Sequence, residues 1–344
     1  MALVLNQSQL GSVKITPTTA GRGNVCIYLG DASSLYPIWE RPTVIVVDGP
    51  YGLGSFPGDP PTPDNLVEWY EPHVKAWSER ALPSATLWFW NSELGWAIIH
   101  PLLVKDGWEF RNCHVWNKGV GHIAGNANSK TLRKFPVVTE VCVQYVRVNR
   151  LPAPGASEPL PLKEWLRYEW ERTGLPLYLT NRACGVVNAA SRKYFTKDHL
   201  WYFPPAQAFD RLVRYANEHG EPSGRPYFSA DGVRPLTGEE WEALRAKFNC
   251  LFGVQNVWNE PPVHGPERVK GANGRPFHAN QKPLSLMRTI IEASSDEGDA
   301  VWEPFGGMCT AAVAALEMGR RCESAEILPE FFEVASQRLM NASG

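Results

Sequence analysis

The sequence predicts an α/β protein in which a doubly wound, Rossmann-like sheet carries an inserted lobe. Residues 43–47 and 300–302 are short apolar runs, each followed by an acid and a turn rich in proline and glycine. Such runs are typical of parallel strands with loops at their carboxyl ends. Helical patterns lie between the two runs, so strand and helix alternate. The length of 344 residues leaves room for both a core and an insert.

The elements can be assigned in order along the chain. A helix is expected over residues 65–82, where apolar residues recur at helical spacing after Pro63 and Asp64, which can cap it. Two more helical patterns follow in the middle of the chain, at residues 206–218 and 238–248. The last third repeats the rhythm of strand and helix, with a strand at 322–326 and helices at 284–293, 311–318 and 330–339.

The chain divides into three parts. Residues 151–161 are rich in proline and resemble a linker, and the aromatic and basic stretch behind them lacks the α/β rhythm until about residue 280. We therefore expect a first part of the core at 1–150, an insert that serves recognition at 151–260, and a second part of the core at 261–344.

Composition excludes several classes of protein. Hydrophobic residues make up 44% and charged residues 20%, which excludes a disordered chain and a coiled coil. The chain has no run of 18 apolar residues, and its start lacks the pattern of a signal peptide. Its seven cysteines form no Cys-x-x-Cys pair, which argues against a disulfide framework and a zinc site. We expect a soluble cytoplasmic protein without a metal.

The net charge of −2 argues at first against a nucleic-acid partner. That average conceals a polarity, because residues 48–110 hold nine acids against three bases and residues 111–150 hold seven bases against one acid. Two further basic groups are Arg182, Arg192, Lys193 and Lys197, and Arg268, Lys270, Arg275, Lys282 and Arg288. The charge pattern alone is explained equally well by a solvated protein surface as by a surface that binds nucleic acid.

The strand at residues 43–47 ends in Asp48, Gly49, Pro50 and Tyr51. This turn can hold a flat heterocycle, because the Asp48 carboxylate and the Gly49 carbonyl can accept both hydrogens of an exocyclic amine while Tyr51 stacks on the ring. An ordinary strand-end turn with a buried tyrosine explains the same residues.

A glycine-rich turn at residues 303–310 joins a strand to a helix, and Glu326 follows Gly307 by nineteen residues. In nucleotide-binding folds such an acid binds ribose hydroxyls. A nicotinamide-dependent oxidoreductase therefore stays open. Against it, Glu303 and Phe305 stand where the dinucleotide pattern needs its first glycine.

Five segments together resemble the beta group of amino-methylating DNA methyltransferases, which methylate adenine or cytosine with S-adenosylmethionine. Residues 48–51 resemble the catalytic motif IV, Asp-Pro-Pro-Tyr, and residues 303–310 resemble motif I, Asp-Pro-Phe-x-Gly-Ser-Gly-Thr. The other three segments resemble motifs III, X and II, at residues 28–35, 278–283 and 325–326. The order of the motifs is that of the beta group, and the resemblance covers residues 25–150 and 255–340.

This resemblance implies a methyltransferase sheet and a set of site residues. Catalysis falls to Asp48, Gly49, Pro50 and Tyr51, and the middle insert becomes a target-recognition lobe. Asp31 would bind the adenine amine of the cofactor, Glu326 its ribose, and Glu303 its methionine end. The full set of implied cofactor residues is Asp31, Gln281, Lys282, Glu303, Phe305, Gly306, Gly307 and Glu326. For Lys282, a helix-start residue before Pro283 is an equal interpretation.

The chain departs from the family pattern at three positions. Gly49 replaces the first proline of motif IV, which should loosen the turn while keeping its carbonyl. Glu303 replaces aspartate and Cys309 replaces a loop glycine, so the contacts of the cofactor are the least certain part of the resemblance.

The motifs predict the reaction. Adenine N6 is favoured over cytosine N4, because N4 enzymes usually begin motif IV with serine where this chain has Asp48. No cysteine follows a proline, so the covalent route to C5-methylcytosine has no candidate nucleophile. The target base must leave the double helix to react, and residues 52–63 are a candidate lid over it.

Double-stranded DNA is the expected partner, and the basic segments are its expected contacts. The candidate DNA-binding residues are Lys130, Arg133, Lys134, Arg182, Arg192 and Lys193. The resemblance leaves open a homodimer and a partner restriction endonuclease. A DNA-binding module with a decayed catalytic core is the non-enzymatic alternative, motivated by Gly49 and Cys309.

Overall fold

The computed structural model describes residues 18–342 except 55, 120–132, 134, 272 and 279. Its central feature is a nine-stranded mixed sheet with the strand order β1-β2-β11-β10-β3-β4-β6-β5-β9. The strands are β1 Thr19–Arg22, β2 Val25–Leu29, β3 Val44–Val47, β4 Thr86–Asn91, β5 Trp108–Asn117, β6 Thr139–Arg147, β9 Val257–Trp258, β10 Ala300–Glu303 and β11 Arg321–Glu326.

The middle of the sheet is parallel. Strands β2, β11, β10, β3 and β4 run in one direction, whereas β1 and β6 pair antiparallel with their neighbours. All four residues of β3 are buried, as expected of a strand that is covered on both faces. The predicted doubly wound sheet is confirmed, with antiparallel strands added toward its edges.

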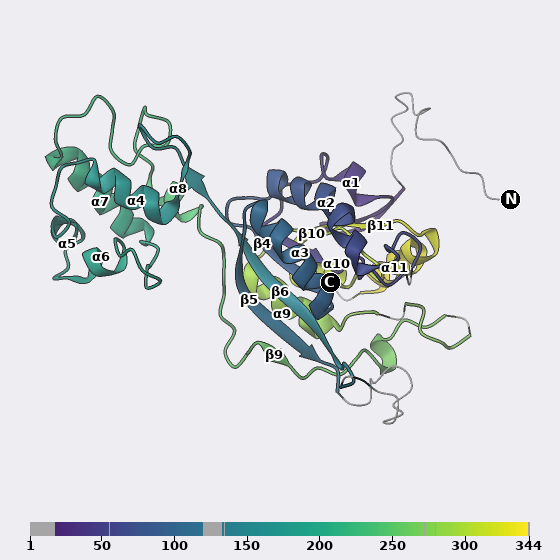
Figure 1. Cartoon of the computed structure of the whole chain (residues 1–344). Helices are drawn as coiled ribbons and strands as arrows, with labels where there is room; N and C mark the ends of the chain where they lie inside the picture. The colour runs from purple at the N-terminus through teal and green to yellow at the C-terminus, as the bar shows by residue number, and fades with distance from the viewer. Residues whose placement is uncertain are drawn as a thin grey trace.

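Helices cover both faces of the sheet (Figure 1). Val44 and Val46 point into the core under α9, α10 and α11, and Ile45 and Val47 point into the core under α1, α2 and α3. This alternation follows from the two-residue period of a strand. The helices are α1 Ala32–Leu35, η1 Pro63–Asn65, α2 Leu66–Arg80, α3 Glu93–Lys105, η3 Gly265–Glu267, α9 Leu284–Ser294, α10 Thr310–Glu317 and α11 Pro329–Asn341.

The predicted elements of the core are confirmed to within two residues at each end. The pattern at residues 238–248 was wrong in its second half, because α8 ends at Glu242. Trp241 is buried in the lobe, but Phe248 at the end of the same pattern is exposed as the chain leaves the lobe. The sequence did not indicate α3 or strands β4, β5 and β6.

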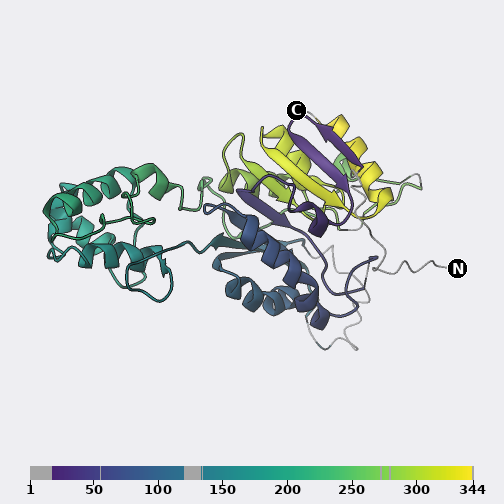
Figure 2. The ribbon, with the colours of Figure 1, turned by 90° about the horizontal axis from the view of Figure 1, so that it is seen from above.

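A small helical lobe stands apart from the sheet (Figures 1 and 2). It has a hydrophobic core of its own, with Trp165, Trp170, Phe209 and Trp241 at its centre. The lobe consists of the ribbon β7 Arg150–Leu151 and β8 Leu160–Pro161 and the helices α4 Leu162–Glu171, α5 Leu179–Cys184, α6 Ala189–Lys193, α7 Ala206–His219 and α8 Gly238–Glu242.

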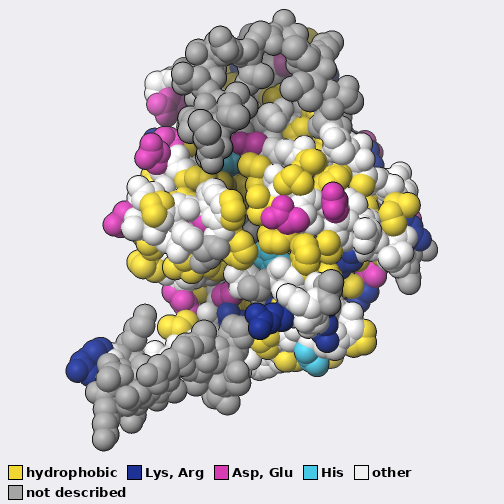
Figure 3. All heavy atoms as spheres, turned by 90° about the vertical axis from the view of Figure 1, so that its right-hand side faces the viewer, with side chains coloured by type: hydrophobic (Ala, Val, Ile, Leu, Met, Phe, Trp, Pro, Cys, Tyr) yellow, Lys and Arg dark blue, Asp and Glu magenta, His cyan; other side chains and the backbone are white. Residues whose placement is uncertain are grey.

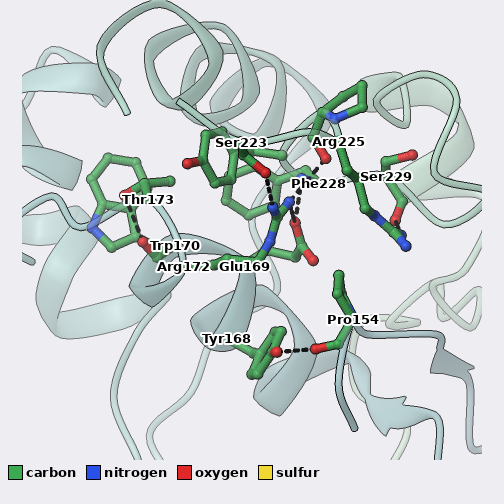
Figure 4. A network of polar contacts seen from close by, with 12 residues as sticks. Pro154, Tyr168, Glu169, Trp170, Arg172, Thr173, Ser223, Arg225, Phe228 and Ser229 are labelled. Atoms are coloured by element: carbon green, nitrogen blue, oxygen red, sulfur yellow. Dashed lines mark hydrogen bonds and ion pairs between the residues drawn. The ribbon is translucent and has the colours of Figure 1, made fainter. Parts of the chain in front are cut away.

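A buried carboxylate organises the lobe (Figure 4). Glu169 of α4 accepts hydrogen bonds from Arg172 (2.8 Å) and from the backbone N–H of Phe228 (2.7 Å). Phe228 has a φ of +56°, a conformation that is costly for a residue with a side chain. Arg172 also binds the Ser223 hydroxyl and the Pro226 carbonyl, so this network fastens the loop before α8 to α4.

The sheet has two functionally different edges. We call the edge at which β3, β4, β10 and β11 end the carboxyl edge, and the opposite one the amino edge. Strand β6 is antiparallel to β4, with Val141 opposite Asn91 and Val146 opposite Thr86, so the chain leaves β6 for the lobe at the amino edge. The returning segment is fastened there too, because Lys247 pairs with Asp299, just before β10. The lobe is therefore attached across the sheet from the carboxyl edge.

None of the helices in the described ranges is long and apolar enough to cross a membrane.

Candidate active site

A cavity of about 290 Å³ opens at the carboxyl edge. Its walls come from the turns that follow β3, β10 and β11 and from the segment that precedes α9. The cavity brings together every residue predicted to act in catalysis or cofactor binding, namely Asp31, Asp48, Gly49, Pro50, Tyr51, Gln281, Lys282, Glu303, Phe305, Gly306, Gly307 and Glu326. Residues that are nearly 300 positions apart in the sequence thus share one site.

The turn after β3 is held tightly. The Pro50 carbonyl accepts hydrogen bonds from the Tyr70 hydroxyl and the Asn91 amide, both at 3.0 Å. A Cβ atom on Gly49 would lie 2.5 Å from the Tyr70 hydroxyl and 2.7 Å from the Phe305 ring. A side chain at this position would have to displace these two rings, so the turn is crowded at Gly49, and a looser turn stays a prediction.

Asp48 is part of a buried cluster of charges. Its Oδ1 lies 2.7 Å from the Lys282 ammonium, which is also 3.3 Å from Oε2 of Glu140. The other oxygen of Glu140 lies 2.7 Å from Lys118. We call Asp48, Lys282, Glu140 and Lys118 the four-charge cluster. Its acids and bases alternate and balance, which reduces the cost of burying them.

Tyr51 is connected to the same cluster. Its hydroxyl lies 3.3 Å from Asp48 Oδ1 and 3.2 Å from Glu140 Oε2, and it accepts a hydrogen bond from Lys282 at 3.3 Å. Because a phenol has one proton, Tyr51 donates to only one of the two carboxylates at a time. These contacts fix the direction in which the Tyr51 ring points.

Burial and charge compete in this cluster. Burial raises the pKa of the Asp48 carboxyl above its usual value, and the nearby Lys282 cation opposes that rise. Burial acts in the same way on Glu140, but Lys282 and Lys118 outweigh it and hold the pKa of Glu140 below its usual value. Burial disfavours the Lys282 cation, yet the two carboxylates raise the pKa of Lys282, which stays charged.

Glu140 and Lys118 were not predicted as site residues. Glu140 comes from β6 and Lys118 from the end of β5, two strands that the sequence analysis did not assign. One signal could have indicated the position, because Glu140 is the single acid among the seven bases of residues 111–150. A single acid in such a basic stretch indicates that its side chain pairs with a particular basic side chain.

Glu303 serves the start of α10. Its two oxygens accept hydrogen bonds from the backbone N–H groups of Ala311 (2.8 Å) and Ala312 (3.1 Å), and Ser324 donates to it at 2.9 Å. A carboxylate at a helix N-terminus satisfies unpaired donors and complements the helix dipole. Burial nevertheless raises the pKa of Glu303 to about 7. Its predicted contact with the methionine end of the cofactor stays a prediction.

Cys309 directly precedes α10 in a left-handed conformation, with a φ of +50°. Glycine adopts this conformation without strain, which explains why a glycine suits the position in motif I. The cysteine is buried and its sulfur lies 3.4 Å from the Ser324 hydroxyl. The departure at residue 309 thus fills space beside the cap of α10.

Two more acids of the cavity, Glu326 and Asp31, are held by backbone groups. Glu326 accepts hydrogen bonds from the N–H groups of Gly307 (2.7 Å) and Leu328 (2.8 Å), so it joins the turns after β10 and β11. Asp31 accepts a hydrogen bond from the N–H of Ser33 and caps α1. The Asp31 side chain therefore both caps α1 and lines the cavity.

Residues 52–63, apart from 55, lie along the mouth of the cavity. The Phe56 ring stacks on His278 with the centroids 5.1 Å apart, and Asp59 accepts hydrogen bonds from the N–H groups of Gly52 and Leu53. Burial lowers the pKa of His278 to about 4, with Lys282 and Arg268 adding to the effect, so its ring is neutral at pH 7. The role of this loop as a lid stays a prediction.

The rim of the cavity is apolar. Leu53 and Ile327 line the cavity and are both exposed. Figure 3 views the molecule from the side that lies opposite the lobe, and it shows hydrophobic side chains across the middle of the described surface with acidic side chains among them. A surface of this kind favours contact with flat, partly apolar groups.

The predicted DNA-binding residues that the structure describes lie in two separate places. Lys130 and Lys134 lie outside the described residues, and Arg133 is exposed in the connection between β5 and β6, at the carboxyl edge. Arg182 of α5 and Arg192 and Lys193 of α6 are exposed in the lobe, which is attached at the amino edge.

A second basic feature lies beside the cavity. Residues 269–277, apart from 272, form a short hairpin, in which the Gly271 N–H donates to the Arg275 carbonyl (2.9 Å) and the Phe277 N–H donates to the Val269 carbonyl (3.0 Å). Lys270 and Arg275 are exposed on this 269–277 hairpin, and the chain enters the cavity wall directly behind it, at His278. The sequence analysis placed both residues in a basic group but gave them no role.

Within the ranges that the structure describes, no three His, Cys, Asp or Glu side chains converge as a metal site would require.

Comparison with known proteins adds independent information. A family model described as DNA methylase, N6_N4_Mtase, matches residues 43–337. The Type II methyltransferase M.HinfI of Haemophilus influenzae is 35% identical over 85 residues, which are 25% of this chain and 24% of that protein. The Type II methyltransferase M2.MboI of Moraxella bovis is 26% identical over 148 residues, 43% of either chain. The chain thus aligns with less than half the length of these relatives.

Solved structures show the same architecture. The PvuII DNA methyltransferase, described as cytosine-N4-specific, superposes with a TM-score of 0.51 at 10% identity, over 93% of this chain and 94% of that one. The M1.HpyAVI–SAM complex superposes with a TM-score of 0.48 at 15% identity, over 92% of this chain and 99% of that one. The likeness to PvuII methyltransferase extends across almost the whole chain and identifies a shared fold.

Proposed function

Because its residues 43–337 match the family model, the chain belongs to the DNA methylase family, and we propose that it methylates N6 of adenine in double-stranded DNA with S-adenosylmethionine. The observation that supports this proposal most is the state of Asp48. One of its oxygens is held by Lys282, and none of the described residues donates to the other, Oδ2, which belongs to a residue that lines the cavity.

The chemistry of the turn suits an aromatic amine. The amine nitrogen is a weak nucleophile because its lone pair is delocalised into the base. When bound, S-adenosylmethionine supplies a methyl group on a positively charged sulfur. Asp48 Oδ2 and the Gly49 carbonyl can accept the two amine hydrogens, which turns the lone pair out of the plane of the base and toward the methyl group. Tyr51 offers a ring face for the flipped base.

The cavity offers hydrogen-bond acceptors and an aromatic wall that suit S-adenosylmethionine. Glu326 stands at the end of β11 and Asp31 at the start of α1, where carboxylates can accept from ribose hydroxyls and from an adenine amine. The glycine-rich turn leads into the N-terminus of α10, and Phe305 and Trp69 supply an aromatic wall with ring centroids 5.2 Å apart. Glu303 contributes by holding this turn in place.

The preference for adenine depends on one residue. An ionised Asp48 accepts two hydrogen bonds strongly and carries a negative charge toward the amine, which suits the family pattern for adenine N6. The structural relative PvuII methyltransferase is described as cytosine-N4-specific, so cytosine N4 is the alternative that the experiment must separate.

The DNA should lie along the carboxyl edge, because the flipped base must reach Asp48. The 269–277 hairpin with Lys270 and Arg275, and the connection that carries Arg133, adjoin this edge and supply positive charge for phosphates. The basic side chains of the lobe can reach DNA only farther from the target nucleobase. A cytoplasmic location is consistent with chromosomal DNA as the substrate. A homodimer and a partner restriction endonuclease stay predictions from the resemblance.

The test is mass spectrometry of nucleosides from DNA that has been incubated with the protein and S-adenosylmethionine. We expect N6-methyladenine with the wild type and none with Asp48→Ala, since the amine then lacks its charged acceptor. Glu71→Ala removes an exposed acid of α2 and serves as the matched control, which should keep full activity.

Three outcomes would contradict the proposal. N4-methylcytosine without N6-methyladenine would replace the target base and keep the enzyme class. A wild-type protein that binds DNA and methylates neither base would support the DNA-binding module, and calorimetric binding of NADH in preference to S-adenosylmethionine would support the oxidoreductase.

A further inference from the structure

Lys282 occupies an unexpected position in this site. The family resemblance placed it beside the cofactor, yet its side chain is only 2% exposed and its ammonium group lies 2.7 Å from Asp48 Oδ1. It also lies over the rings of Tyr51 (5.5 Å) and Trp90 (5.4 Å), where the faces of two aromatic rings stabilise a cation. Among the described residues, the polar partners of this lysine are Asp48, Tyr51 and Glu140, and none of these contacts needs a ligand.

The geometry divides the two oxygens of Asp48 between two tasks. A carboxylate can rotate about its Cβ–Cγ bond, and a short contact between Oδ1 and a buried ammonium prevents that rotation. Oδ2 then points away from Lys282, and the Asp48 side chain is 22% exposed beside the cavity. The lysine thus fixes the acceptor that the amine needs.

Glu140 has a matching task on the other side of Lys282. It shares the ammonium through Oε2 at 3.3 Å, while Lys118 holds its other oxygen at 2.7 Å. A lysine side chain has four rotatable bonds, and a second carboxylate restricts where its ammonium lies. Glu140 also repels the charge of Asp48, so it acts on Asp48 in the direction opposite to Lys282.

We infer that Lys282 and Glu140 are positioning residues of the catalytic site, which orient Asp48 and set its charge through one shared ammonium group. The inference rests on the proposed methyl transfer. It assigns Lys282 to the acceptor of the amine instead of to the cofactor, and it adds β6 and β5 to the elements that build the site.

The charged and titratable groups that face Asp48 come from four segments. They are Lys282 before α9, Glu140 and Cys142 on β6, Tyr51 in the same turn, and Tyr70 on α2. Of these groups, Lys282 is the cation and Glu140 the second carboxylate, and burial raises the pKa values of Cys142, Tyr51 and Tyr70 further above neutrality. A change in the titration of Asp48 therefore reports on Lys282 and Glu140.

The test compares Lys282→Met with Glu140→Gln in full pH profiles of kcat. Loss of the cation leaves burial and Glu140 unopposed, so the acid limb of the Lys282→Met profile should move up by about one pH unit or more, with kcat reduced about tenfold. Loss of the second carboxylate leaves Lys282 to Asp48 alone, so the acid limb of Glu140→Gln should move down. A merely structural role cannot produce shifts of opposite sign.

Three further measurements separate the alternatives. The affinity for S-adenosylmethionine, measured by calorimetry, should stay within about threefold of the wild type in both variants, because neither group binds the cofactor. The double variant should recover part of the rate lost in Lys282→Met, because Asp48, left without its cation, then no longer faces the charge of Glu140. Lys247→Met removes a lysine that pairs with Asp296 and Asp299 at the amino edge and should leave the profile unchanged.

The inference is overturned if Lys282→Met weakens the binding of S-adenosylmethionine while the pH profile stays in place, since the lysine then serves the cofactor. It is equally overturned if both profiles move in the same direction. If Lys282→Met does not fold, the Glu140→Gln profile alone decides, because a shift upward or no shift contradicts the shared ammonium. A wild-type protein without methylation would contradict the proposed function itself.

Discussion

Single residues show how strongly a motif depends on its neighbours. Gly49 differs from the family motif, and the sequence alone suggested a looser turn. In the structure the Tyr70 hydroxyl and the Phe305 ring lie where a side chain would begin, so the turn is crowded at this position. That crowding weakens the case for a decayed catalytic core.

Replacement of Gly49 tests this packing. In Gly49→Ala the new Cβ would lie 2.5 Å from the Tyr70 hydroxyl, so the turn that carries Asp48 must move. We expect kcat to fall on the order of 100-fold, since a displacement of about 1 Å has that effect on catalysis. The measurement is the initial rate of methyl transfer at saturating cofactor.

Gly224→Ala is the matched control for this variant. Residue 224 lies in the lobe with open space around its Cα, so an alanine there should leave the rate unchanged. A Gly49→Ala enzyme with wild-type kcat would show that the turn tolerates a side chain.

At the scale of single elements, the helix α10 depends on individual side chains at its N-terminus. The N-terminus of α10 is capped by Glu303 from β10, with Ser324 of β11 completing the shell of donors. The motif places this acid next to the glycine-rich turn, but only the fold shows that its oxygens bind the helix. The carboxylate is nonetheless buried, and burial raises its pKa to about 7.

This elevated pKa predicts how the cap responds to pH. The folded protein holds a proton on Glu303 that the unfolded chain, with a usual value of 4.5, releases, so the contribution of Glu303 to stability is present at low pH and is lost between about pH 4.5 and 7. Relative to Glu303→Gln, the wild type should lose about 2–3 kcal/mol of unfolding free energy between pH 5 and pH 8.

Urea unfolding of both proteins at several pH values measures this difference. Glu71→Gln, in which an exposed acid of α2 is changed, supplies the reference and should run parallel to the wild type. A Glu303→Gln curve that also runs parallel to the wild type would contradict the proposed titration of the cap.

At the scale of the whole molecule, the placement of the lobe changes how its charges are interpreted. The chain enters and leaves the lobe at the amino edge, and ten residues of β5 separate this edge from the other, roughly 30 Å at about 3.3 Å per residue. Several bases of residues 111–150 also serve the fold. Arg147 binds the carbonyls of Asp106 and Gly107, and Lys118 belongs to the four-charge cluster.

Binding of duplexes of two lengths tests which bases contact DNA. On a duplex of about 14 base pairs, centred on the target, Lys270→Ala with Arg275→Ala should lower the slope of log affinity against log salt by about 2, since each phosphate contact contributes about 0.9. The lobe variant, with Arg182, Arg192 and Lys193 changed to Ala, should affect only a duplex of about 30 base pairs.

Fluorescence anisotropy at several salt concentrations supplies these slopes, and calorimetry with S-adenosylmethionine should show unchanged cofactor binding in both variants. If the lobe variant weakens binding to the short duplex as much as the hairpin variant does, the DNA does not follow the carboxyl edge as proposed.

Local strand and helix patterns were enough to predict the α/β class, and the motifs indicated twelve of the residues that line the cavity. Glycine turns, strand-end acids and helix periods are local features, and local features can be recognised from sequence. The side of the sheet from which the lobe projects was decided only in the tertiary structure, by the antiparallel pairing of β6 with β4. The partners of Asp48 were decided there too, because Lys282 and Glu140 come from segments 142 positions apart and meet only when β6 and the segment before α9 pack against the same turn. The local sequence can single out Glu140 as a lone acid but cannot name its partner, because the pairing follows from burial, which tolerates an ion only beside its counter-ion.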